Sequence, residues 1–117
     1  MQKINVDEVV IDGQTYVPKV EKPEGKYFIV RTYSAGVFFG EIESKNGKEV
    51  VMKNARRIWY WSGAASLSQL AVEGTNKPKE CKIPVAMPRV ELTEAIEIID
   101  VTPTAKKSLE SVPVWEQ

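Results

Sequence analysis

Apolar and polar residues alternate in three consecutive runs in the middle of the chain, and these runs predict three strands. They cover residues 26–33, 37–44 and 49–61. A turn of small residues separates the first two runs, and Asn46-Gly47, a pair typical of tight hairpins, separates the last two. An alternation with period two places successive side chains on opposite faces of a sheet. We therefore expect an antiparallel meander, which the glycines between and within the strands allow to curl into a small barrel-like sheet.

The first 25 residues predict a β-hairpin arm followed by a polar linker. Two short apolar runs flank Asp12-Gly13, which favours a two-residue hairpin turn. Prolines and charged residues follow up to residue 25 and do not continue the pattern. Because an isolated hairpin is only marginally stable, we expect this arm, residues 1–25, to pack on the main domain, residues 26–117, or on a second copy.

Helical signals follow the third strand. Ser66, three residues ahead of a glutamine, fits a capping box that opens a short helix. Two prolines restrict residues 83–90 to an edge strand, whereas residues 91–101 alternate and predict a further strand. Thr102-Pro103 is typical of a helix start. The expected fold is mainly β with short helices (α+β): a small barrel-like antiparallel sheet with an N-terminal hairpin arm and a short C-terminal helix.

Composition excludes several classes of function. The chain has 117 residues, enough for one domain, and its 16 basic and 16 acidic side chains give a net charge of zero. No overall field would then hold it on nucleic acid or on an anionic membrane. Histidine is absent and Cys81 is the only cysteine, which argues against the usual nucleophilic and zinc sites and against an internal disulfide. We expect a cytoplasmic, non-catalytic protein with no metal, no cofactor and no membrane span.

The strongest candidate for function is the stretch NARRIWYW, residues 54–61. Arginine guanidinium groups can pair with an anion, and large flat rings beside them can stack on an aromatic base, so the stretch suits a ligand such as a nucleotide. They suit a protein interface equally well. If the strand stays extended, Arg57 shares a face with Trp59 and Trp61, while Arg56 lies on the opposite face. One arginine at most would then line a given pocket within one subunit.

Three residues outside this stretch are weaker candidates. Arg31 could lie across from the third strand if the meander curls, or form a surface ion pair. Ser34 opens a turn whose amides could face a phosphate, although a plain turn explains it too. Ser66 marks a helix N-terminus, where anions are favoured, but it could simply cap that helix. The candidate ligand-binding residues are therefore Arg31, Ser34, Asn54, Arg56, Arg57, Trp59, Tyr60, Trp61 and Ser66.

Several segments of the sequence resemble a family of small phage and prophage proteins. The resemblance is carried by VRTYSAGV (30–37), NARRIWYWSGA (54–64) and SLSQLA (66–71), and it extends to LTEAIEI (92–98) and VPVW (112–115). This family is similar to the one that contains the Thoeris anti-defence sponges, phage proteins that sequester a cyclic ADP-ribose signal made by a bacterial TIR-domain enzyme.

The resemblance implies a phage-encoded oligomer that acts in the cytoplasm of an infected bacterium. It would hold the nucleotide signal without cleaving it and so block antiviral immunity. The residues themselves, rather than the resemblance, suggest the contacts: Arg56 or Arg57 would pair with the phosphates, one of the rings at 59–61 would stack on the base, and Asn54 could read the edge of the base. Two alternatives stay open: a structural or interaction module of the phage, for instance a virion component, and a small nucleic-acid binder, against which the zero net charge argues.

Overall fold

Five strands form one antiparallel sheet in the computed structural model, which describes residues 25–116. In chain order the elements are β1 (Phe28–Thr32), β2 (Val37–Asn46), β3 (Glu49–Arg57), α2 (Leu67–Glu73), the 3-10 turn η1 (Pro78–Glu80), β4 (Met87–Leu92), β5 (Ala95–Asp100) and α3 (Pro103–Glu110). The hairpin arm expected in residues 1–25 falls outside the described residues and stays a prediction.

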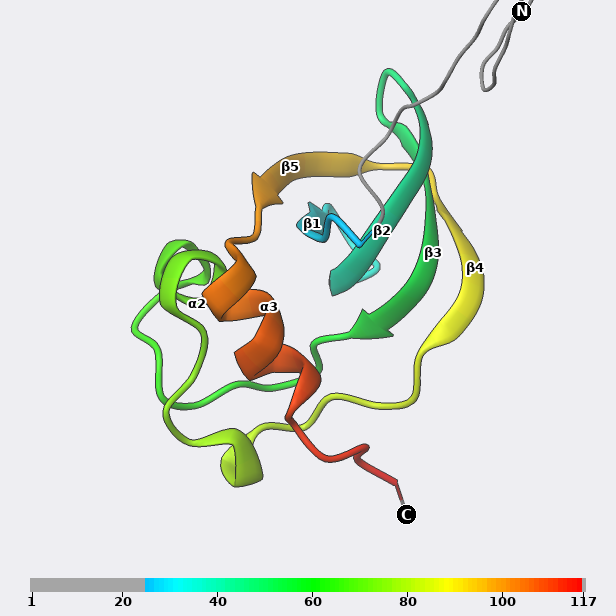
Figure 1. Ribbon diagram of the computed structural model, residues 1–117. Helices are drawn as coiled ribbons and strands as arrows, with labels where there is room; N and C mark the ends of the chain where they lie inside the picture. The colour runs from blue at the N-terminus through cyan, green and yellow to red at the C-terminus, as the bar shows by residue number, and fades with distance from the viewer. Residues whose placement is uncertain (1–24, 117) are drawn as a thin grey trace, which may run out of the picture.

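The sheet is curled but open (Figure 1). Its strand order is β4-β3-β2-β1-β5, so two strands that follow each other in the chain, β4 and β5, lie at opposite edges. In the described part of the chain these two edges are not paired with each other. A mainly β fold with short helices and a C-terminal helix is confirmed. The sheet does not close into a barrel, which corrects the barrel-like expectation, because the turn between β4 and β5 carries the chain to the other edge without strand pairing.

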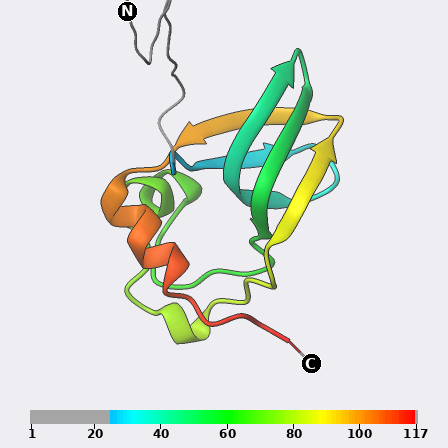
Figure 2. The same cartoon turned by 45° about the vertical axis from the view of Figure 1, so that its right-hand side comes forward.

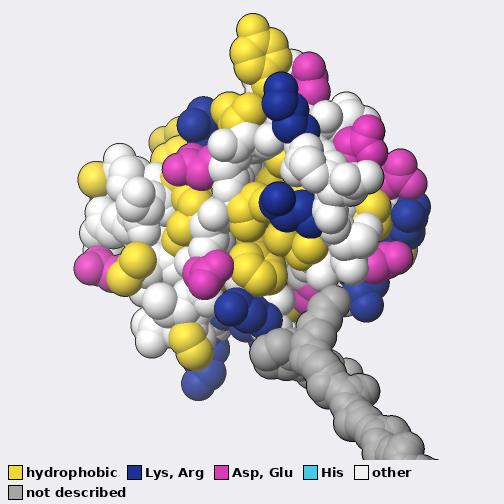
Figure 3. Space-filling view, turned by 90° about the horizontal axis from the view of Figure 1, so that it is seen from above, with side chains coloured by type: hydrophobic (Ala, Val, Ile, Leu, Met, Phe, Trp, Pro, Cys, Tyr) yellow, Lys and Arg dark blue, Asp and Glu magenta, His cyan; other side chains and the backbone are white. Residues whose placement is uncertain are grey.

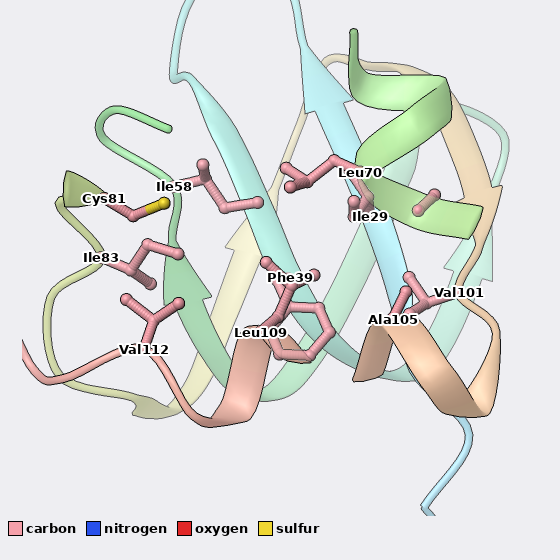
Figure 4. Close-up of a cluster of buried hydrophobic side chains, with 11 residues drawn as sticks. Ile29, Phe39, Ile58, Leu70, Cys81, Ile83, Val101, Ala105, Leu109 and Val112 are labelled. Atoms are coloured by element: carbon pink, nitrogen blue, oxygen red, sulfur yellow. The ribbon is translucent and has the colours of Figure 1, made fainter. Parts of the chain in front are cut away.

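Side chains that alternate along the strands belong to two separate hydrophobic clusters, one on each face of the sheet. The inner cluster lies within the curl and consists of Val30, Phe38, Val50, Met52, Ala55 and Leu92. The helix-side cluster lies under α2 and α3 and includes Ile29 and Phe39 from the sheet and Ile58, which follows β3 (Figure 4). Neighbouring residues in a strand therefore belong to different clusters, as a period of two requires.

The two helices pack on each other beside the sheet, and their caps hold them there. The Ser66 side chain accepts a hydrogen bond from the Gln69 amide, so the predicted cap of α2 is confirmed. The Thr102 side chain caps α3 by accepting from the Ala105 amide, and its hydroxyl donates to the Val72 carbonyl of α2 at 2.7 Å. One threonine thus begins the second helix and ties it to the first.

Two predicted strand boundaries are wrong. The third strand was expected to reach residue 61 but ends at Arg57, because β2 begins at Val37 and offers no further partner. The single strand expected over residues 91–101 is two strands, and the turn between β4 and β5 at residues 93–94 separates them. Pro88 lies within β4, which as an edge strand tolerates a residue without an N–H.

A β-bulge at Asn54 interrupts β3. Phe39 pairs with Arg56 and Glu41 pairs with Lys53, so β3 uses three steps where β2 uses two. Asn54 takes up the extra residue with a φ of 51°, a left-handed conformation that asparagine tolerates better than most side chains. Opposite the bulge, a Cβ at position 40 would lie 2.8 Å from the Ala55 Cα, so only glycine fits there. The bulge reverses which residues of β3 face the helices from that point on.

Replacing Asn54 therefore tests whether the bulge conformation limits stability. Asn54→Val should lower the free energy of unfolding by about 1–2 kcal/mol, because a β-branched side chain resists a positive φ. Asn54→Gly should change it by no more than about 0.5 kcal/mol. Urea unfolding followed by tryptophan fluorescence measures both. Equal losses in the two variants would show that the Asn54 side chain, and not the backbone conformation, matters.

Candidate functional site

A surface pocket of about 440 Å³ lies where β3 leaves the sheet. It is built from the β1–β2 turn, the start of β2 and the residues that end and follow β3. Its lining consists of Ala35, Gly36, Val37, Arg57, Ile58, Trp59 and Trp61. Three of the predicted site residues, Arg57, Trp59 and Trp61, are thus brought together on one pocket.

Arg57 supplies the positive charge of this pocket. Its guanidinium carbon lies 4.7 Å from the centre of the Phe38 ring, a cation–π geometry that holds the group on the inner cluster. Within residues 25–116, no carboxylate lies at ion-pair distance from Arg57. A half-buried arginine with no ion-pair partner among the described residues has guanidinium donors that an anion can bind.

Two indole rings form walls of the pocket. Trp61 is fixed, because its Nε1 donates to the Ala64 carbonyl at 3.1 Å and its ring packs against the helix-side cluster. Trp59 is 64% exposed, and its ring lies nearly parallel to that of Trp115, with centroids 6.3 Å apart. A mostly exposed ring beside an arginine can stack on a flat ligand group.

Arg56 is buried on the other side of the sheet, where main-chain carbonyls surround its guanidinium. The group donates to Ile83 O at 2.7 Å, Pro84 O at 3.0 Å, Leu109 O at 3.3 Å and Pro113 O at 3.5 Å. Burial lowers the pKa of Arg56 from its high ordinary value. The sequence interpretation gave the phosphate to either arginine, and the structure places only Arg57 at the pocket. Arg56 instead ties the end of α3 and the segment before β4 to β3.

The three candidates outside the 54–61 stretch have partners of their own. Arg31 forms an exposed ion pair with Glu97 at 2.9 Å, which matches the surface alternative weighed above. The Ser34 hydroxyl lies 3.5 Å from a Glu94 carboxylate oxygen. Ser66 caps α2. None of these three lines the pocket.

The two remaining candidates also lie away from the pocket lining. Asn54 occupies the bulge and is exposed. Tyr60 pairs with Lys82 through the backbone in an isolated bridge, and its side chain is 52% exposed.

The turn formed by Ser34 and the next two residues is closed by Thr32, whose hydroxyl accepts from the Ala35 amide at 2.9 Å. That amide is therefore occupied, as in a plain turn.

Sequence reasoning missed Val37 and Ile58, the apolar side of the pocket. Val37 begins β2, and the Ile58 amide donates to its carbonyl at 2.8 Å, a contact that extends the pairing of β2 and β3 by one step. The turn glycine, Gly36, has a φ of 105° and lies close to the Arg57 side chain. The only available signal was position, because Gly36 and Val37 border a predicted turn and Ile58 follows Arg57.

Charges of both signs are mixed on the face seen in Figure 3, with apolar and neutral groups between them. This distribution gives that face no area of one sign to attract a polyanion. In the part of the chain that the structure describes, no helix is long and apolar enough to cross a membrane. The same part holds no cluster of three or more acidic or cysteine side chains that could bind a metal.

Fold and site together define a small domain in which an open five-stranded sheet carries two helices and an arginine–tryptophan pocket. The chain belongs to a family described as a domain of unknown function (DUF6948), whose model matches residues 25–109. No curated protein and no solved structure matches the chain. The matched residues include the whole pocket and end within α3.

The two neighbouring arginines should contribute to stability by different amounts. Arg56→Met should lower the free energy of unfolding by about 2–4 kcal/mol, because four main-chain carbonyls lose a charged donor. Arg57→Met should cost no more than about 1 kcal/mol, the scale of an exposed cation–π contact. Urea unfolding of both variants provides the comparison. A larger loss from Arg57→Met than from Arg56→Met would contradict these assignments.

Proposed function

We propose that this domain binds a small anionic ligand with a flat ring, of the nucleotide class, and holds it without changing it chemically. The observation that carries the proposal is the Arg57 guanidinium, which has no ion-pair partner in the described part of the chain and lines the same pocket as the indole rings of Trp59 and Trp61. In this arrangement Arg57 pairs with phosphate, and Trp59 stacks on the base.

The size and the composition of the pocket support a small ligand. Its volume of about 440 Å³ falls in the range of roughly 300–1,000 Å³ that is usual for small-molecule sites. The lining is apolar except for Arg57, and apolar walls with a few placed polar groups are typical of such sites. Because the pocket opens at the surface, a second copy of the chain is proposed to complete it, as a symmetric dimer would.

Binding without cleavage is supported by what lines the pocket. The lining residues carry no carboxylate, hydroxyl, thiol or imidazole, so they supply neither a general base nor a nucleophile. Arginine keeps its proton at any working pH and serves as an electrostatic partner. A sponge for a signalling molecule needs affinity of this kind and no proton transfer.

The specific ligand we propose is a cyclic ADP-ribose signal, and this choice rests on the sequence resemblance to the Thoeris anti-defence sponges. Such a molecule presents a diphosphate to Arg57 and an adenine to Trp59. The protein would then be phage-encoded and would act in the cytoplasm of the infected bacterium, where sequestering the signal blocks host immunity. It needs no cofactor.

A second candidate function is a phage interaction module, such as a virion component. The observation that favours it is the stacked pair Trp59 and Trp115, with the exposed apolar side chains Val85 and Val114 from the two segments that lead to β4 and follow α3. Tryptophan is enriched among interface anchors. This alternative predicts the protein in purified particles and no affinity for nucleotides.

Arg57→Met should weaken nucleotide binding strongly while the protein stays folded. Loss of a charge-assisted contact worth about 1.5–3 kcal/mol corresponds to a Kd about 10- to 150-fold higher. Isothermal titration with ADP, ADP-ribose and isomers of cyclic ADP-ribose measures the change. Arg31→Met is the matched control, because Arg31 is paired with Glu97 outside the pocket, and it should leave the Kd unchanged.

Chemical analysis of the ligand after binding separates a sponge from an enzyme. Heat denaturation of the complex should release cyclic ADP-ribose intact, as mass spectrometry would detect. Recovery of the hydrolysed product would contradict binding without cleavage. If none of the probes binds the wild-type protein at millimolar concentration, the nucleotide proposal fails and the interaction module takes its place.

A further inference from the structure

The segment that follows α3, residues 111–116, has a fixed path across the end of the sheet. Val114 forms a parallel bridge with Ile83, and the Trp115 amide donates to the Ile83 carbonyl at 3.1 Å. Val112 is buried in the helix-side cluster, and the Pro113 carbonyl accepts from Arg56. Figure 2 shows this segment leaving α3 and passing along the stretch that leads into β4.

This path brings the Trp115 ring against Trp59. The two rings are inclined by only 11°, with centroids 6.3 Å apart, which is within the range of offset-stacked pairs. The Lys82 ammonium lies 5.5 Å from the centre of the Trp115 ring. Trp115 is therefore held by its backbone, by a cation and by a ring, whereas the neighbouring Trp59 is 64% exposed.

An exposed ring at the wall of a pocket keeps a single orientation before a ligand binds only if another part of the protein packs against it. Immobilising a side chain on binding costs affinity, roughly 0.5–1.5 kcal/mol for each one ordered. A partner ring that already holds Trp59 removes this cost before the ligand arrives. The backbone of residues 113–115 is bonded to Ile83 and Arg56, so the support comes from a fixed part of the chain.

We propose that Trp115 is a positioning residue of the binding site: it stacks on Trp59 and holds that ring in place as the wall on which a flat ligand group stacks. The segment 111–116 is then part of the site. The part of this inference that concerns a bound ligand rests on the proposed function. The part that concerns the orientation of the Trp59 ring does not. Residues 110–116 follow the part that the family model matches, so the support for Trp59 lies outside the matched domain.

Two measurements on the full chain test the inference. The first is ¹⁵N relaxation of the Trp59 indole Nε1–H without ligand: its order parameter should fall in Trp115→Ala and stay near the wild-type value in Trp115→Phe. The second is the Kd of the tightest-binding probe among ADP, ADP-ribose and cyclic ADP-ribose. It should rise about 2- to 12-fold in Trp115→Ala, which is the affinity equivalent of ordering one side chain. Val85→Ala, an exposed apolar change outside the stack, should alter neither.

Each result decides a separate point. An unchanged Trp59 order parameter in folded Trp115→Ala overturns the inference, and so does a lower order parameter with an unchanged Kd. If the wild type binds no probe but the order parameter still falls, Trp115 positions Trp59 and the proposed nucleotide function fails. If Trp115→Ala does not fold, Trp115→Leu, which keeps an apolar contact and removes the ring, replaces it in both measurements against Trp115→Phe.

Discussion

The structure depends on the buried guanidinium of Arg56. Its donors reach four main-chain carbonyls, in the segment before β4, at the end of α3 and in the chain beyond it. The Ile83 and Leu109 carbonyls also accept from the Trp115 and Val112 amides, so the arginine adds a second, charged donor to each. Hydrogen bonds to a charged group contribute about 1.5–3 kcal/mol each. The arginine thus joins these segments to β3 and stays charged. It also fixes the segment that carries Trp115, so a buried structural contact determines how one wall of the pocket is built.

The bulge at Asn54 decides which of two adjacent arginines has which role. Beyond the bulge, Arg56 points to the helix side, while Ala55 and Arg57 point to the inner cluster and the pocket. Without the extra residue the alternation would place Arg56 where Arg57 lies. One residue with a positive φ, facing a glycine that leaves room for it, thus separates a structural cation from one that a ligand can reach.

Local signals predicted much of the fold. The cap at Ser66 and the helix start at Thr102 are present, and the tight turn between β2 and β3 is present one residue later than expected, at Gly47-Lys48, because Asn46 pairs with Glu49. These features depend on a few adjacent residues, so the sequence displays them directly. The end of β3 and the division between β4 and β5 were missed, because a strand ends where its neighbour ends, and that neighbour is set by the order of strands in the sheet.

By itself, the sequence determined that this is a mainly β domain with two capped helices, with no net charge and with its arginines and tryptophans concentrated in residues 54–61. The tertiary structure alone decided that Arg57, Trp59 and Trp61 share a pocket, that Arg56 binds carbonyls and that Trp115 supports Trp59. The physical reason is that main-chain carbonyls are the same in every residue type, so no sequence pattern marks the ones that a buried arginine will bind. Likewise, the Trp115 ring, 56 positions away in the chain, meets Trp59 only after the helices and the sheet have packed.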